Sequence, residues 1–72
     1  MNVNTALLKS FIIKNSETQK ELAAAMGLSL STLNAKINGK ACFRQNEINF
    51  IRDRYCIDPN DLVQVFFAEK VS

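Results

Sequence analysis

The chain has 72 residues, of which 47% are apolar and 22% are charged, with a formal net charge of +2 and no histidine. A chain of this length forms one small domain that commits most of its large apolar residues to a single core, which leaves little for a catalytic cleft. Because histidine is the most common general base and metal ligand, its absence also argues against an enzyme, and we expect no cofactor, no metal and no small-molecule substrate.

The N-terminal part of the chain predicts two short helices. Between residues 3 and 12, apolar side chains recur at steps that place them on one face of a helix of about three turns, which residues 15–16 end. Thr18 and Glu21 then form a capping-box pattern, so a second helix begins there. This helix ends at Gly27, because glycine adopts the left-handed turn of a helix end without steric cost.

A third helix follows after a very short turn. Either Ser29 or Ser31 can cap it, and Leu33 and Ile37 lie four residues apart on its inner face. The Asn-Gly pair at residues 38–39 ends it. Two helices joined by a short turn that contains glycine are the generic signature of a helix-turn-helix, which we place at about residues 18–38.

The C-terminal part predicts two further helices. One runs from Arg44 or Gln45 to Tyr55. The last segment, residues 59–71, begins as a short helix at Pro59, because proline is favoured at the first helical position, and it continues as helix or as an extended segment. The expected fold is therefore all-α, a single domain over residues 1–72 with about five helices.

The charges are unevenly distributed along the chain. Residues 1–54 hold eight basic and four acidic side chains, a net charge of +4, whereas the rest holds one basic and three acidic, a net charge of −2. A basic body with an acidic end is compatible with nucleic acid on one side and a protein on the other. No apolar run approaches the roughly 18 residues of a membrane span, and the start lacks a signal-peptide pattern, so we expect a cytoplasmic protein that has no membrane partner.

The two cysteines, Cys42 and Cys56, form an even pair, but a disulfide needs an oxidising compartment and nothing in the sequence directs export. Two thiols without histidine cannot complete a four-ligand zinc site. We therefore expect both to be buried or half-buried small apolar residues.

The stretch TQKELAAAMGLSLSTLNAKINGK, residues 18–40, resembles the helix-turn-helix of temperate-phage repressors of the Cro type. The segments FRQNEINFIRDRY and QVFFAEKVS, residues 43–55 and 64–72, resemble a subgroup of short phage regulators that includes the modulator-of-repression (antirepressor) proteins of lactococcal phages. The resemblance implies a lambda-repressor-like DNA-binding fold and a place in the lysis-lysogeny switch of a phage, in the cytoplasm of a bacterial host. For the narrower subgroup it also implies direct association with the phage's main repressor.

The resemblance also implies which residues face DNA. The positions that face bases are Ser29, Leu30, Ser31, Asn34 and Ala35. The positions that face phosphates are Gln19, Lys36, Asn38, Lys40 and Arg44. This sequence departs from the usual pattern, because Leu30 and Ala35 can do no more than touch a thymine methyl and serines are weak, adaptable partners. Base readout by this protein alone is therefore expected to be poor.

Two functions follow as hypotheses. In the first, the chain is a helix-turn-helix transcriptional regulator that binds double-stranded operator DNA and modulates the phage repressor. In the alternative, it is an antirepressor that binds the repressor's DNA-binding domain directly and reads little DNA. The C-terminal segment has more apolar residues than one face of a short helix can bury, which indicates a contact with a protein partner or in a homodimer. The candidates for such a contact are Leu30, Val63, Phe66 and Phe67. The alternative for the C-terminal residues is complete burial in the core. Leu30 lies three residues before Leu33, so the sequence leaves it open between the core and the surface.

Overall fold

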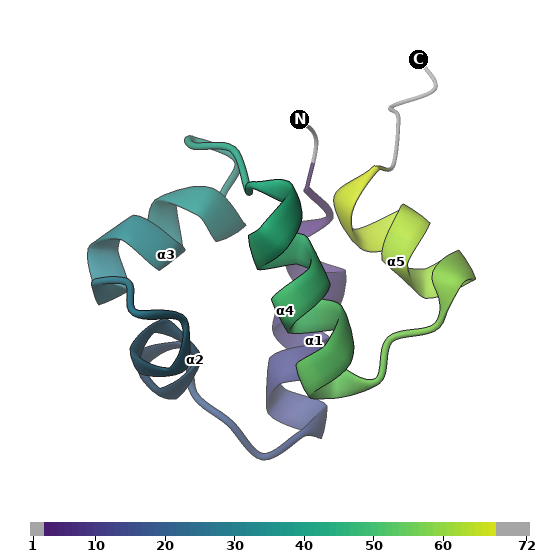
Figure 1. Ribbon diagram of the computed structural model, residues 1–72, viewed down its shortest axis with the longest axis horizontal. Coiled ribbons are helices and arrows are strands. Elements are labelled where there is room, and N and C mark those ends of the chain that lie inside the picture. The colour runs from purple at the N-terminus through teal and green to yellow at the C-terminus, as the bar shows by residue number, and fades with distance from the viewer. Residues whose placement is uncertain (1–2, 68–72) are drawn as a thin grey trace.

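A computed structural model describes residues 3–67, which form five helices and no strand, as the all-α prediction requires. The helices are α1 (Thr5–Lys14), α2 (Gln19–Met26), α3 (Leu30–Ile37), α4 (Gln45–Tyr55) and α5 (Pro59–Phe66). In Figure 1, α2 and α3 lie at one end of the molecule and α5 at the other, with α1 and α4 between them. None of the described helices has the length and apolar character needed to cross a membrane. The predicted helical or extended segment beyond Phe67 lies outside the described residues.

The local signals around α2 and α3 are confirmed. The Thr18 hydroxyl accepts a hydrogen bond from the Glu21 amide, and the Glu21 carboxylate accepts one from the Thr18 amide, which completes the capping box. Gly27 ends α2 with a φ of 71°, a left-handed conformation that favours glycine. Ser29, not Ser31, caps α3 and accepts a hydrogen bond from the Thr32 amide at 3.2 Å.

The predicted boundaries of α4 and the predicted start of α5 are also confirmed. Arg44 lies at the N-cap of α4, where its backbone amide donates to the Glu47 carboxylate at 2.8 Å. Asp58 caps α5 by accepting from the Asp61 amide at 2.9 Å, and Pro59 occupies the first helical position. These interactions satisfy amides that have no partner inside their own helix.

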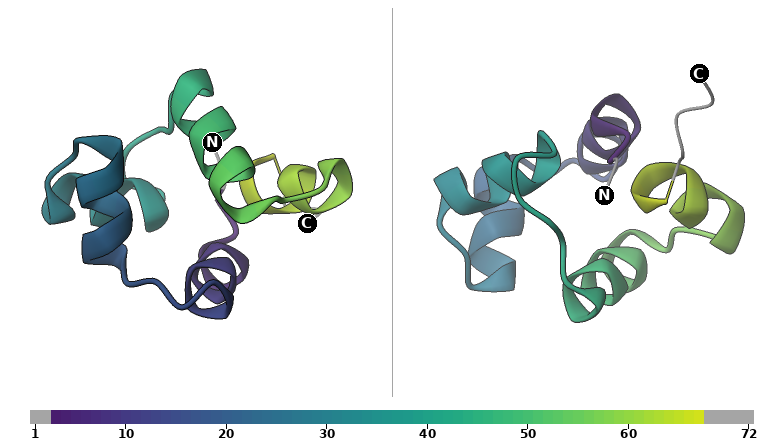
Figure 2. Two further views of the ribbon diagram at one scale, coloured as in Figure 1. Left: turned by 60° about the horizontal axis from the view of Figure 1, so that its bottom comes forward. Right: turned by 90° about the horizontal axis from the view of Figure 1, so that it is seen from above.

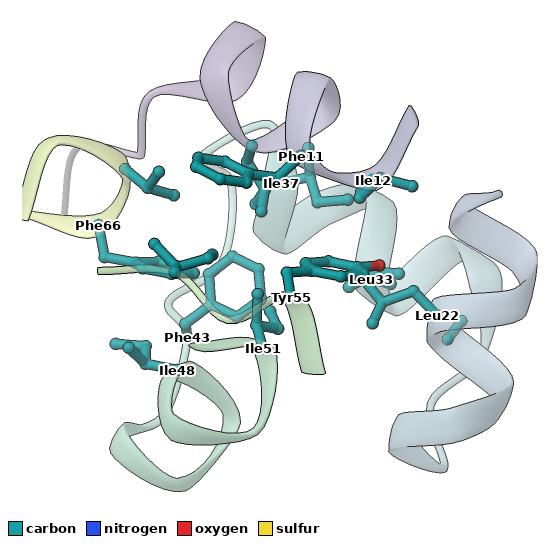
Figure 3. Packing of buried hydrophobic residues seen from close by; sticks show 14 residues of the cluster. Phe11, Ile12, Leu22, Leu33, Ile37, Phe43, Ile48, Ile51, Tyr55 and Phe66 are labelled. Atoms are coloured by element: carbon teal, nitrogen blue, oxygen red, sulfur yellow. The ribbon is translucent and has the colours of Figure 1, made fainter. Parts of the chain in front are cut away.

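One apolar core holds the five helices together, and Figure 3 shows side chains from α1, α2, α3, α4 and α5 meeting in it. Phe43, from the loop before α4, packs edge to face against Phe66 of α5, with ring centroids 5.2 Å apart. Phe66 has no exposed surface. The prediction that Phe66 contacts a protein partner is therefore wrong, because the phase of α5 directs this ring into the core.

The prediction that both cysteines are buried or half-buried is wrong as well. Cys42 and Cys56 are both exposed free thiols. Cys56 is the C-cap of α4 and has a φ of 51°, so it belongs to the turn that leaves the helix and not to its apolar stripe. Cys42 lies in the loop between α3 and α4, where the neighbouring Phe43 takes the place in the core.

Helices α2 and α3 pack against each other across the short connection at residues 27–29. In Figure 1, α2 is seen almost end on while α3 lies across the view, so the two axes cross steeply; the left view of Figure 2 shows the same pair from another side. Leu22 and Ala23 of α2 and Leu33 and Ile37 of α3 are buried. The small Ala23 allows the two helices to approach closely, and the opposite face of α3 is left to solvent.

Candidate nucleic-acid interface

The solvent face of α3 carries an open hollow of about 570 Å³. Its lining is mainly apolar and consists of Leu30, Ser31, Asn34, Ala35, Asn38 and Lys40. All six belong to the ten residues predicted to face DNA, and they include four of the five positions predicted to face bases. The remaining base-facing position, Ser29, lies outside the hollow, because its hydroxyl caps α3 and also donates to the Thr32 hydroxyl at 2.8 Å.

Three amide side chains form a chain of hydrogen bonds between α2 and the end of α3. The Asn38 amide nitrogen donates to the Asn34 carbonyl oxygen. The Asn34 nitrogen in turn donates to the carbonyl oxygen of Gln19, at 3.5 Å. Gln19 is the first residue of α2 and is half-buried, so this chain connects the start of α2 with the hollow on α3. Asn34 was predicted to face bases, and its two hydrogen-bond partners, Gln19 and Asn38, were predicted to face phosphates.

Lys36 does not belong to this surface. Its ammonium group lies 2.6 Å from the Glu47 carboxylate, and both side chains are largely buried, with exposed fractions of 11% and 13%. The prediction that Lys36 faces phosphate is therefore wrong, because its place in α3 directs it toward α4. Burial alone would raise the pKa of Glu47, but the Arg44 amide and the Lys36 ammonium group lower it, so the pair stays ionised.

Two of the predicted phosphate contacts remain exposed cations. Lys40 follows α3, and its backbone amide donates to the Ala35 carbonyl at 2.8 Å, which folds the loop back on the helix beside the hollow. Arg44 is exposed at the start of α4 but does not line the hollow. Gln19 lines a second, smaller hollow of about 240 Å³ at the start of α2, together with Lys9 of α1.

A second ionic cluster holds the α1–α2 connection against α4. The Glu17 carboxylate accepts hydrogen bonds from Arg54, whose Nε lies 3.0 Å away, and from the Tyr55 hydroxyl at 2.6 Å. The Arg54 hydrogen bonds, followed by that of Tyr55, lower the pKa of Glu17. Burial and the Glu17 carboxylate raise the pKa of Tyr55. This cluster fixes the loop from which α2 begins.

Three of the four apolar residues predicted to contact a partner are exposed, and they lie in two places. Leu30 and Phe67 are each 46% exposed and Val63 is 54% exposed, whereas Phe66 is buried. Leu30 lies on the hollow of α3, while Val63 and Phe67 lie four residues apart on the outer side of α5, at the other end of the molecule in Figure 1. They therefore form two separate exposed apolar sites.

Comparison with known families gives one assignment. Residues 1–69 match a family described as "Protein of unknown function (DUF739)". The chain belongs to this family. No curated protein and no solved structure matches the chain.

Sequence reasoning missed two features of this DUF739 domain. It assigned Glu47 and Glu17 no partner, although each is the acceptor of an ion pair that joins two parts of the fold. It also missed Lys9, which lies beside Gln19 only because α1 and the start of α2 are adjacent in space. Within residues 3–67 of the DUF739 domain, no three His, Cys, Asp or Glu side chains are grouped so as to hold a metal ion.

Proposed function

We propose that this DUF739 protein is a helix-turn-helix transcriptional regulator of a temperate-phage lysis-lysogeny switch, which binds double-stranded DNA through α3 and modulates the phage repressor. The observation that carries the proposal is the hollow on α3. Six of the ten residues predicted to face DNA from the resemblance to Cro-type regulators line this single surface. α3 stands against α2 across a three-residue connection with Gly27, the arrangement of a helix-turn-helix.

In this proposal α3 lies in the major groove and nearby groups hold phosphates. Lys40 and Arg44 supply positive charge on the chain that follows α3. Gln19 at the start of α2 supplies an amide donor, since its carbonyl oxygen already accepts from Asn34. Lys36 contributes no charge to the interface because Glu47 neutralises it. The electrostatic attraction is therefore modest, in keeping with the net charge of +2.

The test is a fluorescence-anisotropy titration of the pure protein on DNA from the intergenic switch region of its own genome, with shuffled DNA of equal length as the control. Both titrations are made at about 50 mM and about 200 mM salt, because phosphate contacts release counterions and weaken with salt. Binding that is tighter on the native sequence and sensitive to salt supports the proposal. Equal, weak binding to both sequences contradicts DNA reading by this protein alone.

The apolar character of the hollow favours a second candidate function. Leu30 is 46% exposed beside Ala35, and an exposed apolar site on a small domain indicates a protein contact. In this alternative the protein is an antirepressor that binds the DNA-binding domain of the phage repressor and reads little DNA. The outer side of α5, with Val63 and Phe67, is a second candidate surface for the same contact.

Substitutions separate these two surfaces. Leu30→Glu places a charge in the α3 hollow, and Phe67→Glu places one on α5, and both sites are exposed enough for the fold to survive. The antirepressor alternative predicts that at least one of these variants fails to co-elute with the repressor's DNA-binding domain while its circular dichroism spectrum stays helical. If both variants fold and still associate normally, the repressor does not bind at these sites.

A further inference from the structure

The exposed face of α3 offers a limited set of groups for reading bases. Arginine and lysine are the residues that pair with guanine, acidic residues accept from cytosine, asparagine pairs with adenine, and apolar side chains contact the thymine methyl. α3 contains no arginine and no acidic residue, and its one lysine, Lys36, is committed to Glu47. The residues that α3 itself contributes to the hollow are therefore Asn34 with Leu30, Ser31 and Ala35, and Asn38 and Lys40 line it from the chain that follows the helix.

We infer that α3 reads A·T base pairs, with the Asn34 amide on the adenine edge and Leu30 and Ala35 against thymine methyl groups. This inference rests on the proposed DNA-binding function, which it deepens by naming the base pairs that the same surface selects. It is carried by the hydrogen-bond partners of Asn34 and by the apolar residues beside it.

The partners of Asn34 leave it complementary to adenine. An asparagine side chain has two N–H donors and two acceptor lone pairs. One donor is used toward Gln19 and one lone pair receives the Asn38 amide, so one donor and one acceptor are left. Adenine presents N7 as an acceptor and its N6 amino group as a donor in the major groove. Guanine presents two acceptors, N7 and O6, so its O6 would face the Asn34 carbonyl oxygen without a proton between them.

Asn38 and Gln19 also hold the Asn34 amide in place. If this amide alone turned over, its nitrogen would face the donating nitrogen of Asn38 and its oxygen would face the accepting oxygen of Gln19, and both hydrogen bonds would be lost. If all three amides turned over together, both bonds would form again with donors and acceptors exchanged, and Asn34 would again keep one donor and one acceptor. Asn38 and Gln19 are thus positioning residues, because they hold a group complementary to adenine before DNA binds, which lowers the entropy that binding costs.

The apolar residues complete the match to an A·T pair. Leu30 and Ala35 line the same hollow as Asn34. Thymine is the base that places a methyl group in the major groove, so an apolar wall beside an adenine-reading amide fits the pairs of an A·T-rich site. Within the described part of the chain, Lys40 is the one charged residue that lines the hollow, and it lies in the loop after α3 at a position expected to meet phosphate.

The first experiment selects DNA sites with the purified full chain from a pool of duplexes that carry a random central segment. The expected result is a selected site made of A·T pairs at its most constrained positions. Binding of the selected duplex is then compared with a duplex in which those thymines are replaced by uracil, which removes only the methyl groups. Affinity should fall about fourfold for each methyl that is contacted. The Leu30→Ala variant should distinguish the two duplexes much less.

The second experiment tests the Asn34 amide. Asn34→Ala should lose discrimination between the selected adenine and guanine by about 5-fold to 100-fold, the range of a good bidentate contact. Because alanine is a stronger helix former than asparagine, the variant is expected to fold. Asn60→Ala is the matched control, since Asn60 is an exposed asparagine on α5, at the opposite end of the molecule from α2 and α3. It should leave discrimination unchanged.

Asn38→Ala tests the positioning role. It should reduce the ratio of adenine to guanine affinity. Neither the loss of a phosphate contact nor a general loss of structure would give this result, because each weakens binding to both duplexes alike. A selected site of G·C pairs, as Lys40 would favour, or equal binding of thymine and uracil duplexes, overturns the inference but not DNA binding. Failure to bind any duplex at low salt overturns the proposed function and the inference with it.

Discussion

The two faces of α3 differ in where their partners come from. On the inward face, Leu33 and Ile37 have no exposed surface, and Lys36 is bound to Glu47 of α4. On the outward face, Leu30 is about half exposed, and the side chain of Asn34 is hydrogen-bonded to two other amides, Gln19 and Asn38. The inward face is therefore fully used by the fold, and the outward face still has polar and apolar groups for a ligand.

This difference means that stability and recognition can be changed separately. The end of α3 is held by α1, because the Thr5 hydroxyl donates to the Ile37 carbonyl at 2.6 Å, and by α4 through Glu47. Substitutions that remove these inward contacts alter the free energy of unfolding. Substitutions on the outward face should leave that free energy nearly unchanged and act on binding alone.

The largest expected effect is on the inward face. Leu33→Ala removes a fully buried side chain and should lower the free energy of unfolding by about 3 kcal/mol. Leu30→Ala, the same change at an exposed site of the same helix, should cost about 0.5 kcal/mol or less. Urea denaturation followed by circular dichroism measures both. Similar losses for the two variants would contradict the division of α3 into two faces.

The ion pair should give the next largest effect. Lys36→Met leaves the largely buried Glu47 carboxylate without its cation and should lower the free energy of unfolding by about 2 kcal/mol. Adding Glu47→Gln removes the uncompensated charge but keeps an oxygen that can accept from the Arg44 amide, so the double variant should recover about half of that loss. The same denaturation experiment compares the parent protein, the single variant and the double variant. A double variant with a lower free energy of unfolding than the single variant would argue against this ion pair as an inward contact.

The helices and their caps could be predicted because their signals are local. Each signal acts within about one helical turn, as in the Thr18–Glu21 capping box, the end of α2 at Gly27 and the start of α5 at Pro59. The residues that decide each helix end are therefore close together in the sequence. The sequence left open whether Leu30 lies in the core or at the surface. The crossing of α2 and α3 decides this, and it leaves Leu30 exposed.

The errors concern partners that lie far apart in the chain. Lys36 and Glu47 are 11 residues apart, and Glu17 and Arg54 are 37 apart, so no local pattern joins them. The resemblance to Cro-type regulators placed Lys36 toward phosphate, and a lysine in the last turn of a helix usually faces solvent. The prediction for Phe66 failed for a similar reason. Several residues of α5 are apolar, and the helices that α5 packs against decide which of them face the core.

Acid should weaken the contacts of Glu17 and Glu47 but not the hollow. The pKa values of Glu17 and Glu47 are lowered from 4.5 in the fold, so the unfolded chain binds more protons once the pH falls toward that value. The stability that these carboxylates contribute is present above pH 4.5 and is lost as the pH falls through their lowered values. Among residues 3–67, no acidic residue lines the hollow.

Denaturation midpoints measured between about pH 6 and about pH 3 check this prediction. The midpoint should fall with pH in the parent protein. It should fall less in Tyr55→Phe, which removes one of the donors that lower the pKa of Glu17, and less in Lys36→Met, which removes a donor to Glu47. A midpoint that does not change over this range would show that neither carboxylate is stabilised by its partners.

The smallest effect compares two lysines of the same region in DNA binding. Lys40→Ala should weaken binding to all duplexes alike and reduce the slope of log affinity against log salt by about 0.9, the value for one phosphate contact. Lys36→Met should leave that slope unchanged, because Glu47 already neutralises the lysine. Lys14→Ala, on α1 and over the Phe11 ring, serves as the control for loss of an exposed charge outside the hollow.

Titrations of these variants at several salt concentrations distinguish a cation on the inward face of α3 from one beside its outward face. Measurements of the free energy of unfolding do not make this distinction. If the Lys36 variant lowers the slope as much as the Lys40 variant, the ammonium group of Lys36 leaves Glu47 when DNA binds, and the inward face of α3 takes part in recognition. An unchanged slope for the Lys40 variant would instead remove this lysine of the hollow from the DNA interface. It would then favour a protein as the partner of the outward face.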